Sequence, residues 1–463
     1  MRALAALALA LAVAPVAQAA RATLLQPCSI GATKALCGSV VVPENRTLPT
    51  GRTITLHVAV LPAWGTPVRP DPVFYIVGGP GGVATEDLPG IATVWSPVNR
   101  HRDIVFVDQR GVGGSNPLTC QPPAAGFTGT IGDFVTQCIA STGADVAHYR
   151  TPDAVDDLES VRIALGYRKI DIYGGSYGGT VVQMYLAQHP EHLRTAVMDS
   201  TSWLDVPVFE RWGSSAQRAL DLIHRRCLAE APCARAFPRW YDRFRPLLWR
   251  LAHGHAVPVK VGAKSFTIDA ALTADVVEDM STNASSVADI PFTLERAEAG
   301  SFGPLARQAA RRISPTTSLP VMPYAIMCTE RWAVRDPAKV WADASGTYMR
   351  YSGWVRESVL LTQVCPAMPR VSPDPAELVR PQSLLPVLNL VGQADPKDPA
   401  WNTPGFRAAM PNGKEIVVPE QGHGVAFAGC MPNVVNAFFE AGTAKGLDTS
   451  CVALIEAPAF RLR

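Results

Sequence analysis

Apolar and polar residues alternate along the chain in two kinds of segment. Short apolar or β-branched runs that stop at glycine or another turn residue indicate strands. These runs cover residues 39–43, 53–61, 72–77, 103–107, 169–173, 193–198, 384–391 and 415–418. Helical spacing of apolar residues occurs between them, at 154–165, 180–189 and 433–444. This alternation predicts an α/β fold with a mostly parallel, doubly wound sheet and helices on both faces.

Residues 204–380 follow a different pattern. This stretch has few strand-like runs, and its arginines, alanines and tryptophans recur at helical spacing. Helices are expected at 212–228, 241–251, 273–280 and 287–310, and the Ser-, Thr- and Pro-rich segment 314–323 is interpreted as a linker. We therefore expect a helical insertion over 204–380 between two parts of one core, 20–203 and 381–463.

The N-terminus has the pattern of a secretory signal peptide over residues 1–19. Arg2 precedes an unbroken Ala/Leu/Val run over 4–13, and Ala17-Gln18-Ala19 has the small-x-small form of a cleavage site. A membrane anchor is the alternative, but the run is short for a span. No other stretch reaches about 18 apolar residues, so no membrane span is expected. The prediction is an exported protein, periplasmic or extracellular.

The chain has ten cysteines, and the predicted export bears on their redox state. In an exported chain, cysteines are more often disulfides than free thiols. Five local couples are the natural pairing, although sequence does not prove connectivity: Cys28–Cys37, Cys120–Cys138, Cys227–Cys233, Cys328–Cys365 and Cys430–Cys451. A metal site is disfavoured because no Cys-x-x-Cys occurs, and free buried thiols remain the alternative for any couple.

Composition excludes some partners. The 463 residues carry 42 basic and 40 acidic side chains, a formal net charge of +2, and no basic block stands out. This balance argues against nucleic acid as the main partner. With 48% hydrophobic residues, the chain can form a substantial core, so wholesale disorder is excluded.

A candidate nucleophile lies in the sequence Gly174-Gly175-Ser176-Tyr177-Gly178. It fits the pattern G-x-S-x-G, in which a serine occupies a sharp turn between a strand and a helix. Here the β-branched run 169–173 precedes the pattern and the helical run 180–189 follows it. That context favours a catalytic serine over an ordinary structural turn.

A serine hydroxyl needs a base, and the base needs an orienting carboxylate. His423 follows the last predicted strand between two glycines, whereas the other histidines read as surface or packing residues. Asp395 ends the strand 384–391 and precedes His423, which fits the order Ser, acid, His. Asp199 is the runner-up because it also ends a strand, and Asp398 is a weaker neighbour.

The same chemistry needs an oxyanion hole of two backbone N–H groups. Tyr177, the residue after the nucleophile, is expected to supply one. The glycine-rich loop 78–82 is expected to supply the other, from Gly79 first and Gly78 second, because Pro80 has no N–H. The machinery requires no metal and no cofactor.

Together these motifs resemble the α/β-hydrolase fold. Within it, the chain is similar to the proline iminopeptidase and tripeptidyl aminopeptidase family of exported serine exopeptidases. Five segments carry the resemblance: 78–82, 108–115, 174–179, 392–396 and 422–424. Two departures are Val77, where a histidine often precedes the glycines, and Lys397-Asp398-Pro399, where the family often has Thr-Pro.

The resemblance implies a helical cap over the site and cleavage of residues or tripeptides from the free N-termini of short peptides. The C-terminal stretch with Cys430 and Cys451 resembles the terminal module of the tripeptidyl aminopeptidases. Cys328-Thr329-Glu330 resembles a family motif, and Glu330 is expected to bind the substrate amine, the alternative being a surface glutamate. A secreted esterase or lipase with the same triad is the rival function, and a non-catalytic binding protein is disfavoured by the complete Ser, Asp, His set.

Overall fold

The computed structural model describes residues 23–121, 128–262, 264–312, 319–330 and 334–463. The predicted signal peptide, 1–19, lies outside the described residues, and so does the part of the predicted linker from 314 to 318.

A nine-stranded sheet forms the centre of the described chain, in the order β1-β2-β3-β5-β4-β7-β8-β12-β13. The strands β1, β2, β3 and β5 pair antiparallel, and every pair from β5 to β13 is parallel. The bounds are β1 Leu25–Ile30, β2 Thr33–Pro43, β3 Thr53–Leu61, β4 Val73–Ile76, β5 Ile104–Val107, β7 Ile170–Gly175, β8 Leu193–Asp199, β12 Val387–Gly392 and β13 Lys414–Val418. The mostly parallel sheet is confirmed.

Helices pack against both faces of this sheet. Alternate side chains of β3 join two different apolar clusters, Val58 and Val60 one, Ala59 and Leu61 the other. The first cluster contains α5 (Thr151–Ala164) and α6 (Tyr177–Gln188), and the second contains α2 (Ala84–Val94), α3 (Ser96–Asn99) and α18 (Met431–Ala441). Successive side chains of a strand point to opposite faces of the sheet, so one strand contributes to the apolar core on both faces.

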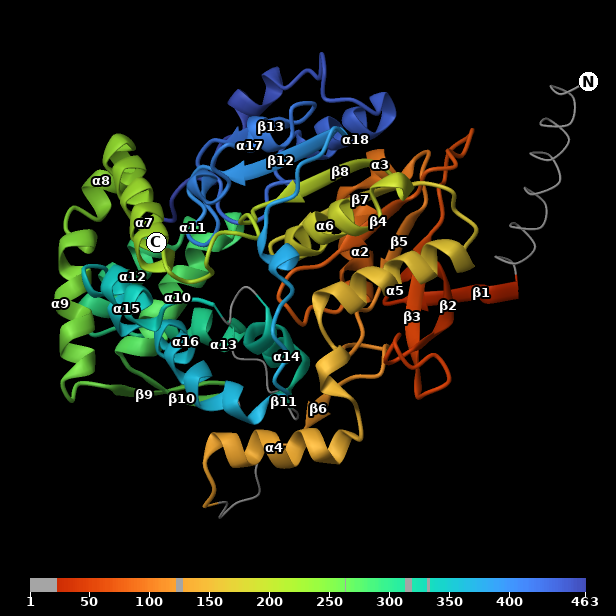
Figure 1. The fold of residues 1–463 in the computed structure, drawn as a ribbon. Helices are drawn as coiled ribbons and strands as arrows, with labels where there is room; N and C mark the ends of the chain where they lie inside the picture. The colour runs from red at the N-terminus through yellow and green to blue at the C-terminus, as the bar shows by residue number, and fades with distance from the viewer. Residues whose placement is uncertain (1–22, 122–127, 263, 313–318, 331–333) are drawn as a thin grey trace, which may run out of the picture.

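The strands β8 and β12 are neighbours in the sheet, yet almost two hundred residues separate them in sequence. Figure 1 shows most of that stretch as a group of helices beside the sheet, in green and cyan. It has an apolar core of its own around Trp240, Phe244 and Tyr348. The helices are α7 Trp212–Ala229, α8 Ala231–Ala236, α9 Trp240–Ala252, α10 Ala270–Thr282, α11 Ala284–Val287, α12 Ile290–Glu298, α13 Gly303–Arg312, α14 Met322–Thr329, α15 Pro337–Ser345 and α16 Gly353–Val364.

Two details of this stretch differ from the sequence analysis. The single helix expected over 287–310 is wrong: α11, α12 and α13 replace it, because Pro291 begins a new helix and Gly300 takes φ +83° between the last two. The stretch also contains an antiparallel hairpin of β9 (Val257–Val261) and β10 (Lys264–Ile268). Smaller described elements elsewhere are α4 Ile131–Thr142, α17 Phe406–Ala409 and the paired β6 Thr119–Cys120 and β11 Leu319–Pro320.

All five expected cysteine pairs are disulfides in the structure. Each closes a local loop, with sequence separations from 6 to 37 residues. Such a cross-link stabilises a fold mainly by restricting the unfolded chain. Within the residues that the structure describes, none of the helices combines the length and the apolar character that crossing a membrane requires.

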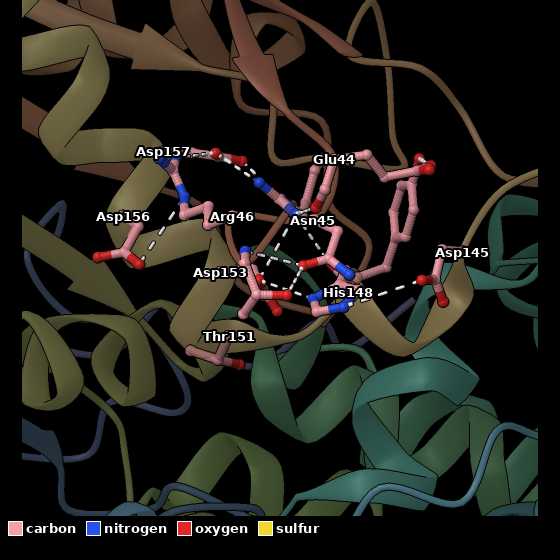
Figure 2. Close-up of polar contacts among 12 residues, drawn as sticks. Glu44, Asn45, Arg46, Asp145, His148, Thr151, Asp153, Asp156 and Asp157 are labelled. Atoms are coloured by element: carbon pink, nitrogen blue, oxygen red, sulfur yellow. Dashed lines mark hydrogen bonds and ion pairs between the residues drawn. The ribbon is translucent and has the colours of Figure 1, made fainter. Parts of the chain in front are cut away.

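A buried arginine anchors the loop that follows β5. Arg110 is fully buried, and its Nε donates to Asp157 Oδ2 of α5 at 2.7 Å. Two further donations go to the backbone oxygens of Glu44 and His148. Arg46 reaches the same Asp157 from the partly exposed side, as Figure 2 shows. The Arg110 guanidinium, matched to the Asp157 carboxylate and two backbone oxygens, therefore joins three segments that are far apart in sequence.

We expect Arg110→Ala to lower the free energy of unfolding by about 3–5 kcal/mol, because it leaves the buried Asp157 without its main partner. Chemical denaturation at neutral pH measures the loss. The matched control is Arg46→Ala, which removes a partly exposed partner of the same carboxylate and should cost about 1 kcal/mol or less. Equal losses for the two variants would contradict the importance of the buried pair.

Candidate active site

Ser176 lies at the sharp turn between β7, which ends at Gly175, and α6, which begins at Tyr177. Its backbone has φ +56° and ψ −123°, which is rare for a residue with a side chain. Strain of this kind persists only where the surrounding structure enforces it, and it is frequent at active sites. The turn also places Ser176 at the N-terminus of a helix, where partial positive charge favours a developing anion.

The glycines around Ser176 are required by close backbone approaches. A Cβ at Gly174 would collide with the carbonyl oxygen of Gly178, and a Cβ at Gly178 would collide with that of Ile76. The strand, the turn and the helix can therefore pack this tightly only without side chains at both positions. This is the physical reason for the G-x-S-x-G spacing.

His423 and Asp395 form a hydrogen-bonded pair. The imidazole Nδ1 lies 2.9 Å from Oδ2 and 3.0 Å from Oδ1 of the carboxylate. Burial opposes a charged imidazole, but the Asp395 carboxylate outweighs it and raises the pKa of His423 above its ordinary value. Burial also opposes the charged carboxylate, but His423 and the backbone N–H groups of Lys397 and Asp398 hold the pKa of Asp395 below its usual range. Asp395 thus stabilises the protonated form of His423 against the effect of burial.

Asp199, the runner-up for the acid, has other partners. Its carboxylate accepts hydrogen bonds from the backbone N–H groups of Val425 and Ala426, each at 2.9 Å, and from the Tyr173 hydroxyl. These contacts hold the loop just after His423. Asp199 therefore lies close to the histidine loop, while the imidazole hydrogen-bonds to Asp395.

The glycine-rich loop 78–82 lies directly against the nucleophile. A Cβ at Gly78 would be 2.9 Å from the Cβ of Ser176, and Gly79 lines the same cavity as Ser176. Tyr177 is the first residue of α6 and follows the nucleophile directly. Gly79 therefore lies at the cavity with Ser176, and the oxyanion-hole role of Gly79 and Tyr177 stays a prediction.

A cavity of about 620 Å³ opens above these residues. Ser176, Gly79 and His423 line one part of it, and apolar side chains from the helical stretch line much of the rest. Those apolar residues include Phe209, Trp212, Pro323, Tyr324, Met327 and Trp354. A cavity of this size with a few convergent polar groups is typical of a small-molecule or short-peptide site.

Glu330 is not among the described residues that line the cavity. It is 1% exposed, and its two carboxylate oxygens accept hydrogen bonds from the backbone N–H of Thr151, at 2.6 Å, and from its hydroxyl, at 2.7 Å. The Thr151 hydroxyl is also 2.7 Å from the hydroxyl of Tyr177. These contacts connect Glu330 to the residue after the nucleophile. Its expected contact with a substrate amine stays a prediction, because the described cavity lining does not include Glu330.

Burial raises the pKa of Glu330 to about 7, although the hydrogen bonds from Thr151 lower it. The stability that this raised pKa brings is fully present below the unfolded value of about 4.3 and is lost as the pH rises through about 7. Glu330→Gln lacks the titration. We expect the variant to be more stable relative to wild type at pH 8 than at pH 5, measured as the free energy of unfolding in parallel urea titrations. A difference that does not change with pH would contradict the assignment.

Metal ligation has one candidate group among the described residues. The ligand atoms of Glu159, His189 and His192 lie within 4.8 Å of one another. However, the guanidinium of Arg162 donates to both oxygens of Glu159 and lowers the need for a cation there. This group is an ion-pair network, and none of its members lines the cavity.

Two residues of the site carry little signal in the sequence. Thr151 follows Arg150 at the start of α5 and becomes relevant only through its contacts to Glu330 and Tyr177. Gln109 lies in the 108–115 motif, and its side-chain amide donates to the Tyr177 hydroxyl at 3.0 Å. The motif could have pointed to Gln109, whereas nothing around Thr151 distinguishes it from an ordinary first-turn threonine.

Two parts of the chain match models of known families. Residues 71–223 match a family model described as alpha/beta hydrolase fold, and residues 353–451 match one described as TAP-like protein. The proline iminopeptidase of Mycobacterium smegmatis aligns in structure over 88% of this chain and 98% of its own, at 16% identity and a TM-score of 0.41.

Several sequence relatives are named as peptidases. A tripeptidyl aminopeptidase of Streptomyces lividans is 32% identical over 187 residues, which is 35% of this chain and 35% of the relative. The serine protease Hip1 of Mycobacterium bovis is 29% identical over 36% of this chain and 35% of the relative. A proline iminopeptidase of Neisseria gonorrhoeae is 31% identical over 31% of this chain and 39% of the relative. The matched part spans little more than a third of each relative's length.

Proposed function

We propose that this chain, which has the α/β-hydrolase fold and is similar to proline iminopeptidases and tripeptidyl aminopeptidases, is a serine exopeptidase that cleaves short peptides from their free N-termini. The observation that carries the proposal is the shared cavity wall of Ser176 and His423, with Asp395 hydrogen-bonded to the far nitrogen of the histidine. Whether one residue or three leave in each cut is a matter for substrate profiling.

The proposed chemistry is acyl transfer in two steps. Ser176 Oγ attacks the scissile carbonyl carbon while His423 Nε2 takes the hydroxyl proton. The same proton then passes to the leaving amine as the C–N bond breaks, which leaves an acyl-enzyme. Water, deprotonated by His423, attacks that ester and restores Ser176. Asp395 orients His423, and the backbone N–H groups of Tyr177 and Gly79 stabilise the oxyanion in both steps.

Two further parts of the proposal concern the whole chain. The helical stretch between β8 and β12 contributes aromatic side chains to the cavity, which supports its role as a cap over the site. Five disulfides and the signal-peptide pattern at residues 1–19 support an exported protein. The proposed partners are short peptides, with no part for nucleic acid.

A matched pair of substrates tests the activity. We expect the purified protein to release the fluorophore from aminoacyl or tripeptidyl amidomethylcoumarins with a free amine, and to act far more slowly on their N-acetylated forms. A neutral p-nitrophenyl ester serves as the third substrate. Hydrolysis of the ester with no release from any free-amine peptide would favour the rival function, a secreted esterase or lipase with the same triad.

A further inference from the structure

Charged side chains are few on the cavity wall. Among the described lining residues, Asp398 is the only carboxylate, and Arg211 and Lys397 are the cationic side chains besides His423. The described cavity wall is therefore mostly apolar, and Asp398 is its one negatively charged side chain. A buried or half-buried charge in such surroundings interacts more strongly with an opposite charge than it would in water.

The position of Asp398 is tied to the proposed triad. Asp395 Oδ1 accepts hydrogen bonds from the backbone N–H groups of Lys397, at 2.8 Å, and Asp398, at 2.9 Å. These bonds fold the chain back on itself directly after Asp395. Asp398 is therefore presented at the cavity by the same turn that holds the acid beneath His423.

The Asp398 carboxylate is also held in place by its neighbours. Its Oδ1 accepts hydrogen bonds from the hydroxyl of Ser202 and from the side-chain amide of Asn402, the latter at 3.2 Å. Both donors line the cavity themselves, and both are largely buried. These contacts fix the orientation of the Asp398 carboxylate at the cavity wall.

The adjacent cation is engaged with a different carboxylate. Lys397 Nζ lies 3.5 Å from Glu278 Oε1 and 5.4 Å from the centre of the Trp212 ring. Glu278 is fully buried beside this ammonium. Burial lowers the pKa of His423, and the charges of Asp395 and then Asp398 raise it. Asp398 and His423 both line the cavity.

We propose that Asp398 binds the N-terminal ammonium of the peptide and so selects free N-termini. This inference rests on the proposed function. It assigns to Asp398 the task that the sequence analysis gave to Glu330, whose carboxylate is hydrogen-bonded to Thr151 and is 1% exposed. The ammonium replaces its hydration with a charge-assisted hydrogen bond to a carboxylate that is already held in position.

The neighbouring aromatic rings suit this role. Trp212 and Trp354 lie 6.0 Å apart between ring centres, and Phe209 stacks on Trp212 at 4.8 Å. All three line the cavity with Asp398. Aromatic faces attract a cation and exclude water from it, which strengthens its pairing with a carboxylate.

The test compares Asp398→Asn with Glu330→Gln, the same carboxylate-to-amide change at the two candidate positions. Each variant is assayed on a free-amine peptide amidomethylcoumarin, its N-acetylated form and a neutral p-nitrophenyl ester. We expect Asp398→Asn to lower kcat/KM on the free-amine peptide about 10- to 100-fold, mainly through KM, and to lower ester hydrolysis much less. The preference for free over acetylated peptide should collapse. Asp448→Asn, an exposed aspartate, controls for the loss of one negative charge.

Each other outcome overturns the inference in a recognisable way. Equal losses on peptide and ester in Asp398→Asn would mean that Asp398 acts through His423 and does not bind the amine. A collapse of the free-amine preference in Glu330→Gln alone would place the ammonium at Glu330. Ester hydrolysis by the wild type with no cleavage of free-amine peptides would instead refute the proposed function itself, before any variant is considered.

Discussion

Ser176→Ala is expected to reduce kcat/KM by about five orders of magnitude or more on peptide and ester substrates alike. The variant loses the hydroxyl that forms the acyl-enzyme, and removal of a catalytic serine in comparable triads costs about 10⁶-fold in kcat. Binding should persist, because the cavity, the histidine pair and the loop 78–82 are unchanged. Steady-state assays on both substrate classes, with active-site titration by a fluorophosphonate, measure the effect.

The matched control is Ser345→Ala, on an exposed turn of α15. Its hydroxyl donates to a backbone oxygen of its own helix and lies outside the cavity lining. The control should keep wild-type activity and should still be labelled by the fluorophosphonate. Residual labelling of Ser176→Ala at the wild-type rate would show that a different residue is the nucleophile.

The sequence predicted those parts of the site that depend on local backbone rules. A β-branched run, the turn at Ser176 and a following helix are consecutive in the chain, so the elbow can be recognised without knowledge of the rest of the fold. The strand end at Asp395 and the glycine-flanked His423 are likewise local features. Local disulfides belong to the same class, since each couple lies within one short stretch.

Other parts depend on packing between distant segments, which spacing does not encode. The carboxylate of Glu330 contacts Thr151, which is 179 positions away in the sequence, and no periodic pattern predicts that contact. The sequence resemblance pointed to Glu330 and carried no information about its contact with Thr151. The same limit explains Asp398, whose place on the cavity wall follows from how the chain turns after Asp395.

Helix boundaries in the insertion show a second limit. Apolar residues continue at helical spacing through 287–310, so periodicity alone favours one helix. Pro291 at the start of α12 and the positive φ of Gly300 after it divide the run into shorter helices. Proline and glycine at those positions predict the helix boundaries better than the apolar pattern does.

Asp395→Asn is expected to lower kcat by about 10⁴-fold and to move the acid limb of the pH–rate profile to lower pH. His423 must be neutral to accept the proton from Ser176, so activity rises as the pH passes its pKa. The Asp395 carboxylate raises that pKa against the effect of burial. An amide carries no charge to stabilise the imidazolium, so the pKa of His423 falls and the limb follows it.

Asp199→Asn is the comparison that separates the two candidate acids. Its carboxylate holds the backbone N–H groups of Val425 and Ala426, so its loss should reduce stability more than it changes the catalytic step. Profiles of kcat against pH for both variants, with unfolding curves, measure the two effects. A 10⁴-fold loss in Asp199→Asn with a nearly normal rate in Asp395→Asn would make Asp199 the acid of the triad. The expected order is the reverse, because the imidazole Nδ1 lies 2.9 Å from Asp395.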